Sequence, residues 1–197
     1  MKNVLHVGCG GHHILGQHGF SPEEWREIRL DINPAVKPDI IGTITNMRDV
    51  PDDSIDAVFS SHNLEHLYAH EVPKALAEFR RVLRDDGFCL IIVPDIQPVA
   101  AMVAEGGILD TAYQSSAGPI TPLDIMYGHR PSLAQGNLYM AHHTAFTRES
   151  LRKQLSEYFL DSLLQSSGFT LVAFATNGSY KTPYMLDIIH SFFGGKK

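Results

Sequence analysis

Short apolar segments alternate with helical patterns over the first half of the chain. Five segments have the pattern of β-strands, at residues 3–7, 28–31, 39–42, 55–60 and 88–93. The last of them is apolar without polar alternates, which is typical of a strand covered on both faces. Before it, Val72, Leu76, Phe79 and Val82 recur at helical spacing. The alternation predicts an α/β fold with a Rossmann-like, doubly wound, mostly parallel sheet and helices on both faces.

The middle of the chain has a different pattern. Residues 97–143 are rich in Gly, Pro, Ser and Tyr, with one short helical stretch at 98–105. We interpret residues 97–143 as an insertion or lid within a single domain that spans residues 1–197, because a chain of this length is typical of one domain.

Two further elements are expected in the last quarter of the chain. Thr147 has the character of a helix N-cap, so we expect a helix from there to about Gln165. Residues 170–176 and 185–190 are expected to form a closing pair of strands around Asn177-Gly178.

The first strand runs into a glycine turn, and an acid ends the second strand. Gly8 and Gly10 can take backbone angles closed to other residues and let a ligand approach the main chain, while Asp31 could accept both hydroxyls of a ribose. A dinucleotide-binding turn needs a third small residue where His13 stands. The turn therefore disfavours a phosphate-bearing ligand and favours an adenosyl group with an amino-acid tail.

Composition bears on which classes of partner the chain binds and on its cellular compartment. The 16 basic and 22 acidic residues give a net charge of -6, so the chain lacks the basic footprint of a nucleic-acid-binding protein. No apolar run approaches the roughly 20 residues that span a bilayer, so we expect no membrane association. The two cysteines, Cys9 and Cys89, form no disulfide framework and suit a reducing, cytoplasmic setting.

Five ordered segments together carry a family resemblance: Val7-Gly8-Cys9-Gly10, Leu30-Asp31, Ser54-Ile55-Asp56-Ala57-Val58, Ser61-His62-Asn63-Leu64-Glu65-His66 and Arg81-Val82-Leu83-Arg84-Asp85-Asp86-Gly87. In this order and at these separations they resemble the class I S-adenosylmethionine-dependent methyltransferases, of the methyltransferase type 11-like kind. The resemblance implies a sheet of about seven strands with the last antiparallel. It also implies a methyltransferase that uses S-adenosylmethionine and acts on an unidentified small or medium-sized acceptor.

The same resemblance implies a set of cofactor-binding residues. Those flanking the methionine moiety are Gly8, Cys9 and Gly10, and Asp31 holds the ribose hydroxyls. Residues beside the adenine or the methyl donor complete the set, which adds Ile32, Thr43, Ile44, Met47 and His62.

Three departures from the family pattern leave alternatives open. Residues 12–20 contain Gly16 and Gly19, so we expect an irregular first crossover, and Thr43 replaces the acid that commonly contacts adenine. Little chain precedes the first strand, so either the insertion or a partner subunit, as in a homo-oligomer, is expected to cover the cofactor. The irregular crossover and Thr43 motivate an alternative function, a catalytically inactive adenosyl-binding regulatory or assembly protein on the same fold.

A short histidine motif suggests a lesser alternative, a zinc hydrolase. His62, Glu65 and His66 match the pattern H-x-x-E-H, in which two histidines on one helix bind zinc. That site needs a continuous helix, whereas residues 55–61 have the pattern of a strand ending just before the motif. We therefore expect no resident metal.

Methyl transfer from a sulfonium needs alignment of donor and acceptor and exclusion of water, and only some acceptors need a base. The side chains placed near the strand ends or in the insertion are the candidates for that base. They are His142, His143, His129, Tyr127 and Asp95, and the sequence does not choose among them.

Overall fold

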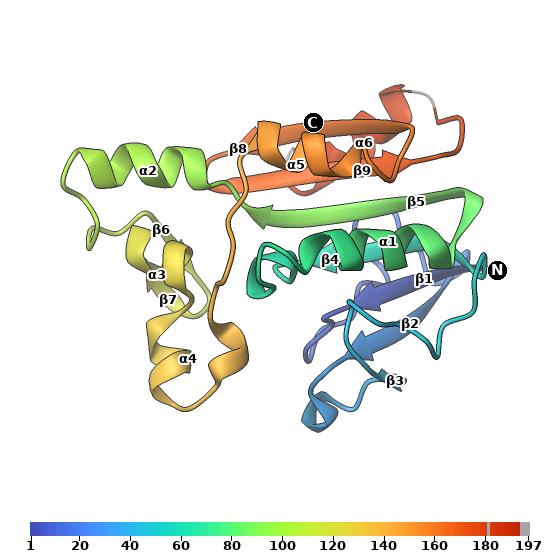
Figure 1. Ribbon diagram of the computed structural model, residues 1–197, viewed down its shortest axis with the longest axis horizontal. Helices are drawn as coiled ribbons and strands as arrows, with labels where there is room; N and C mark the ends of the chain where they lie inside the picture. Colours follow the sequence, from blue (N-terminus) through green and yellow to red (C-terminus); the bar gives the residue numbers. More distant parts are fainter. Residues whose placement is uncertain (181, 194–197) are drawn as a thin grey trace.

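A seven-stranded sheet forms the centre of the computed structural model, which describes residues 1–180 and 182–193 (Figure 1). The strands lie in the order β3-β2-β1-β4-β5-β9-β8. Their bounds are β1 Lys2–Val7, β2 Trp25–Asp31, β3 Ile40–Ile41, β4 Ile55–Ser61, β5 Leu83–Pro94, β8 Asp161–Ser167 and β9 Thr170–Thr176. The first five strands pair in parallel, and β9 pairs antiparallel with both β5 and β8. This arrangement confirms the predicted mostly parallel sheet whose last strand is antiparallel.

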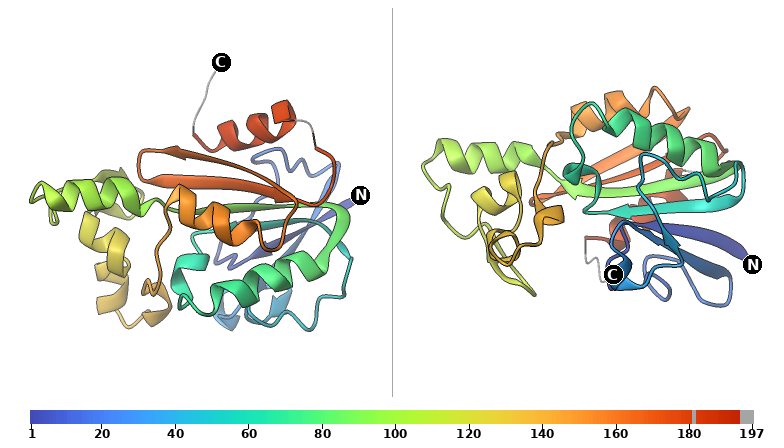
Figure 2. Two further views of the ribbon diagram at one scale, coloured as in Figure 1. Left: turned by 45° about the horizontal axis from the view of Figure 1, so that its top comes forward. Right: turned by 60° about the horizontal axis from the view of Figure 1, so that its bottom comes forward.

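Helices cover both faces of this sheet (Figure 2). On one face lie α1 (Val72–Val82) and α5 (Arg148–Leu155), whose buried side chains pack with alternate residues of β1, β4, β5 and β9. On the other face, α6 (Thr182–Ser191) packs together with the chain before β2, including Phe20. Because neighbouring residues of a strand point to opposite faces, β5 supplies Cys89 and Ile91 to one core and Leu90 and Ile92 to the other.

The crossover from β1 to β2 is irregular, as the sequence predicted. Residues 8–24, all of which the structure describes, form turns and an isolated bridge rather than a helix. Side chains of β2 anchor these turns. Glu27 accepts hydrogen bonds from the Ile14 N–H at 3.0 Å and pairs with the rings of His6 and His13 at 2.8 Å, and Arg29 donates to the Gly10 carbonyl.

Two predictions for the last quarter of the chain were wrong. The helix that Thr147 caps ends at Leu155 rather than near Gln165, because Asp161–Ser167 forms β8 and pairs along its whole length with β9. The hairpin therefore turns at Gly168, whose φ is +56°, and not at Asn177-Gly178. Residues 185–190 lie in α6 and are not a strand, since Met185, Ile188 and Ile189 bury one helical face.

The insertion leaves the sheet at the carboxyl end of β5 and projects beyond it (Figure 1). It contains α2 (Ile96–Ala104), the hairpin β6 (Tyr113–Ser115) and β7 (Gly118–Ile120), α3 (Pro122–Tyr127), α4 (Arg130–Ala134) and the 3-10 turn η3 (Leu138–Met140). Its own small core is built on Val99, Ile120 and Ile125. Two further 3-10 turns, η1 (Pro34–Val36) and η2 (Leu64–His66), follow β2 and β4. Among the described residues, no helix is long and apolar enough to cross a membrane.

Candidate functional site

The glycine turn after β1 is held in a fixed shape by the acid that ends β2. Gly8 and Gly10 both have positive φ, +62° and +51°, which only glycine adopts without strain. The Asp31 carboxylate accepts the Gly10 N–H with one oxygen and the Asn33 N–H with the other, each at 2.8 Å. The carboxylate is thus positioned by two backbone groups at the carboxyl edge of the sheet, where open α/β sheets bind ligands.

A cavity of about 370 Å³, which we call the glycine-turn cavity, opens beside this turn. Seven of the nine residues expected to bind the cofactor line it, namely Gly8, Gly10, Asp31, Ile32, Thr43, Ile44 and His62. The other two, Cys9 and Met47, are buried in the core and are not among its lining residues.

The glycine-turn cavity also has walls that the sequence analysis did not assign. Asn63 follows β4 and lies against Gly8, and Leu138, Tyr139 and Met140 of η3 close the cavity from the insertion side. The sequence analysis expected either the insertion or a partner subunit to cover the cofactor, but it did not single out η3, because the position of η3 depends on how the insertion folds back. The insertion therefore forms part of the wall of the glycine-turn cavity.

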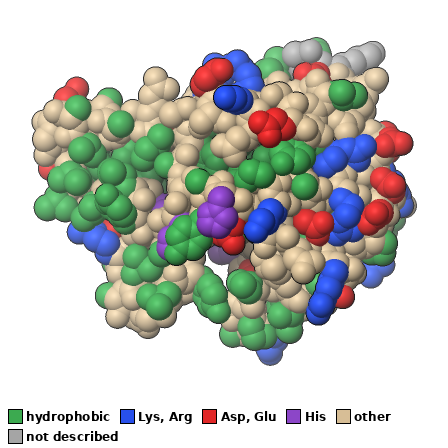
Figure 3. All heavy atoms as spheres, viewed as in Figure 1, with side chains coloured by type: hydrophobic (Ala, Val, Ile, Leu, Met, Phe, Trp, Pro, Cys, Tyr) green, Lys and Arg blue, Asp and Glu red, His purple; other side chains and the backbone are tan. Residues whose placement is uncertain are grey.

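A second cavity, of about 540 Å³, lies between the insertion and the ends of β5 and β9. We call it the insertion cavity. Its walls are largely apolar and aromatic, from Ala112, Tyr113, Ile120, Ile125 and Phe169. His62, His66 and Met140 line both cavities, so the two meet at these residues. Figure 3 shows histidine side chains gathered beside a notch where the insertion meets the rest of the molecule.

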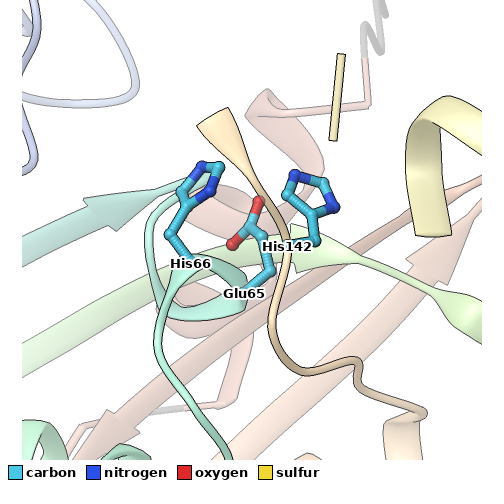
Figure 4. Close-up of side chains that lie close together, drawn as sticks. All are labelled: Glu65, His66 and His142. Atoms are coloured by element: carbon cyan, nitrogen blue, oxygen red, sulfur yellow. The ribbon is translucent and has the colours of Figure 1, made fainter. Parts of the chain in front are cut away.

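At this junction the carboxylate of Glu65 lies between the rings of His66 and His142 (Figure 4). Glu65 and His66 belong to η2, whereas His142 arrives on the chain that returns from the insertion. That return segment is pinned to η2 because the His143 N–H donates to the Glu65 carbonyl at 2.8 Å. The ligand atoms of the three side chains lie within 4.8 Å of one another.

Burial and charge set the protonation of this junction. Burial raises the pKa of Glu65, but the neighbouring His62 and His66 outweigh it and hold the pKa below its usual range. Burial lowers the pKa of His142, and nearby Glu65 only partly offsets this. Burial lowers the pKa of His62 too, but its pairing with Glu65 at 3.3 Å dominates and raises it.

The structure separates the five candidate bases. His129 and His142 line the insertion cavity, and His143 lines the glycine-turn cavity. Asp95 is buried and caps α2 by accepting the Gln97 N–H at 3.0 Å, which is a structural role. Tyr127 is exposed and is not among the lining residues of either cavity.

The segment that matches H-x-x-E-H does not form the helix which a zinc hydrolase of that pattern needs. β4 ends at Ser61, His62 has a positive φ of +50°, and only Leu64–His66 form a single 3-10 turn. This geometry does not supply the two histidines on one helical face on which that motif depends.

The sequence of residues 5–91 matches a family model described as a methyltransferase domain. This range contains the glycine turn, Asp31 and the junction residues of η2. No relative was found among curated proteins.

Solved structures share the fold, and two of the three described next are methyltransferases. A S-adenosylmethionine-dependent methyltransferase from Archaeoglobus fulgidus is 15% identical, with a TM-score of 0.56, over 88% of this chain and 85% of its own. The 1,6-didemethyltoxoflavin-N1-methyltransferase of Burkholderia thailandensis, solved with S-adenosylhomocysteine, is 16% identical, with a TM-score of 0.54, over 88% of this chain and 69% of that enzyme. The PH0226 protein of Pyrococcus horikoshii OT3 is 13% identical, with a TM-score of 0.57, over 89% and 82%. At these identities the likeness concerns the fold.

Proposed function

We propose that this chain is a class I S-adenosylmethionine-dependent methyltransferase that transfers a methyl group from S-adenosylmethionine to a small or medium-sized acceptor. The match of residues 5–91 to a methyltransferase-domain model and the shared fold support this proposal. The cofactor occupies the glycine-turn cavity and the acceptor occupies the insertion cavity. The observation that carries this proposal is the meeting of the two cavities at His62, His66 and Met140.

The glycine-turn cavity suits an adenosyl ligand. Asp31 can accept ribose hydroxyls beside its two backbone contacts, because a carboxylate has about four acceptor sites. In this proposal the amino-acid tail lies along Gly8 and Gly10, and adenine lies beside Ile32, Thr43 and Ile44, which line the same cavity. Tyr139 and Met140 of the insertion would cover the ligand from that side.

The insertion cavity suits an acceptor with an apolar body. Its volume of about 540 Å³ lies within the usual range of small-molecule sites, and Tyr113 and Phe169 offer aromatic surfaces. The junction supplies His66 and His142 to the wall of this cavity, and we place the nucleophilic atom of the acceptor beside them. The sulfonium carbon is attacked in line, its bond to sulfur breaks, and S-adenosylhomocysteine leaves.

The test combines methyl transfer with selective blocking of one cavity. Purified protein is incubated with S-adenosylmethionine carrying a labelled methyl group and a panel of small hydroxyl, amine, thiol and heteroaromatic acceptors. Ala112 lines the insertion cavity, so Ala112→Trp should abolish labelling and leave S-adenosylhomocysteine affinity unchanged. The matched control is Ala117→Trp on the exposed β6–β7 turn, which should label acceptor normally.

Two results would contradict the proposal. Normal labelling by Ala112→Trp would mean that the acceptor does not bind in the insertion cavity. Binding of S-adenosylhomocysteine without labelling of any acceptor would favour the inactive adenosyl-binding protein instead.

A further inference from the structure

Three side chains with metal-binding atoms converge at the junction of the two cavities. The ligand atoms of Glu65, His66 and His142 lie within 4.8 Å of one another. In a tetrahedral zinc site with bonds of about 2.0–2.2 Å, ligand atoms are separated by about 3.3–3.6 Å. Small side-chain rotations, which commonly accompany binding, bring the three atoms to that separation.

Glu65 gives an independent sign that a cation belongs here. Glu65 is 1% exposed, and neither of its carboxylate oxygens has a hydrogen-bond partner among the described residues. The contact from His62 Nδ1 to Oε1, at 3.3 Å, lacks hydrogen-bond geometry. The ion pair with His62 thus leaves both oxygens of this buried carboxylate without a hydrogen bond, which is costly unless a metal or another partner satisfies them.

The two histidines are already held in the form that binds a metal. His66 Nδ1 lies 3.0 Å from the Ala141 carbonyl oxygen, and His142 Nδ1 lies 2.8 Å from the Ile125 carbonyl oxygen. A carbonyl only accepts, so Nδ1 carries a proton in each ring, and Nε2 is the nitrogen left to bind a metal. Donation from the second ring nitrogen to a carbonyl is the usual support of a metal-ligating histidine.

We propose that Glu65, His66 and His142 bind a divalent transition-metal ion, with an open coordination position facing the insertion cavity. Two imidazoles with one carboxylate suit Zn²⁺ and its neighbours in the first transition row, whereas Mg²⁺ prefers oxygen ligands. The sequence alone predicted no metal because it considered His62 with Glu65 and His66. The third ligand comes instead from the return of the insertion.

The metal ion also indicates the chemical class of the methyl acceptor, and this inference rests on the proposed function. An acceptor hydroxyl bound at the open position has its pKa lowered by the ion, and its proton passes to water. The O–CH₃ bond forms as the S–CH₃ bond breaks, which releases S-adenosylhomocysteine. The acceptor class is therefore a small hydroxylated molecule with an apolar body.

Metal binding is measured by calorimetry on protein purified without a histidine tag and dialysed against a chelator, with no acceptor present. Zn²⁺ and Mn²⁺ are titrated separately, with Mg²⁺ as a comparison. We expect one equivalent of Zn²⁺ to bind, and Glu65→Gln and His142→Ala each to weaken it by at least about 100-fold. His70→Ala, an exposed histidine one turn beyond η2, is the matched control and should bind normally.

The outcomes separate the two proposals. No saturable Zn²⁺ or Mn²⁺ binding, or equal affinity in wild type, Glu65→Gln and His142→Ala, would overturn the metal site. Glu65→Gln keeps the shape of the side chain, and its thermal unfolding verifies that the variant is folded. S-adenosylhomocysteine affinity is measured on the same samples, so loss of metal binding with intact adenosyl binding counts against the metal site alone.

Discussion

Gly8 of the glycine turn and Asn63 after β4 lie in direct contact, and no side chain fits between them. A Cβ placed on Gly8 would come within 2.5 Å of the Asn63 side-chain carbon. Both residues line the glycine-turn cavity, so their contact fixes the distance between the turn and the carboxyl end of β4. The shape of the proposed cofactor site thus depends on two strands that are neighbours in the sheet but distant in sequence.

Gly8→Ala tests this contact. The alanine methyl would displace Asn63, and its backbone would be strained at φ +62°. We expect S-adenosylhomocysteine affinity to fall at least about tenfold, the equivalent of ~1.4 kcal/mol. The control is Gly11→Ala, whose Cβ meets nothing within 4 Å, and equal affinity losses in the two variants would contradict a specific role for the contact.

Asp31→Ala removes the proposed ribose acceptor together with its two backbone contacts. Charge-assisted hydrogen bonds contribute about 1.5–3 kcal/mol, so affinity for S-adenosylhomocysteine should fall about 10- to 100-fold. Asp39→Ala is the matched control, since Asp39 accepts one backbone N–H from Arg29 but does not line the cavity. Calorimetry on the folded variants measures the affinity for S-adenosylhomocysteine. An unchanged affinity in Asp31→Ala would refute the assignment of Asp31 to the ribose.

The insertion should lose stability in acid through Asp124. Burial alone would raise the pKa of Asp124, but hydrogen bonds from Arg130 and Thr121 outweigh it and hold the pKa far below its usual range. Because the folded pKa is the lower one, this stabilisation is complete above about pH 4 and is lost as the pH falls toward the folded value.

The variant Asp124→Asn tests that pH dependence. At neutral pH it should lower the thermal unfolding midpoint relative to wild type, and the difference should shrink as the pH falls below about 4. Asp161→Asn, at an exposed position that starts β8, is the control and should track wild type. A difference independent of pH would show that the Asp124 charge is not responsible.

Thr147 stabilises α5 as its N-cap. Its hydroxyl accepts the Ser150 N–H at 3.1 Å, and Ser150 Oγ accepts the Thr147 N–H at 2.9 Å. Thr147→Ala should therefore lower the free energy of unfolding by about 1 kcal/mol. At the other end of the helix, Ser156→Ala at an exposed position should change it by less than about 0.5 kcal/mol. Chemical denaturation measures the free energy of unfolding of both variants. Equal changes in the two would contradict the assignment of Thr147 as a stabilising N-cap.

The elements predicted correctly from sequence are those whose signals are local. The apolar run of residues 88–93 and the periodic spacing of Val72 to Val82 specify β5 and α1 without help from the rest of the chain. The glycine turn and Asp31 are equally local, because each follows directly on a strand. Residues 161–167 lack a strong strand pattern and become a strand by pairing with β9, which a local pattern does not reveal.

The junction could not be predicted for a related reason. Glu65 and His142 meet only because the insertion folds back and the His143 N–H donates to the Glu65 carbonyl. The motif around His62 did point to this part of the chain. It pointed to the wrong set of ligands, because the segment forms a 3-10 turn and not a helix.

The most direct test of the proposed cofactor site is calorimetric titration of the purified protein with S-adenosylmethionine and S-adenosylhomocysteine, with NAD as the control. The glycine turn lacks the third small residue of a dinucleotide site, so NAD should not bind. We expect both adenosyl ligands to bind at one site per chain with micromolar dissociation constants. Absence of adenosyl binding, or NAD binding of equal strength, would contradict the assignment of the glycine-turn cavity to S-adenosylmethionine.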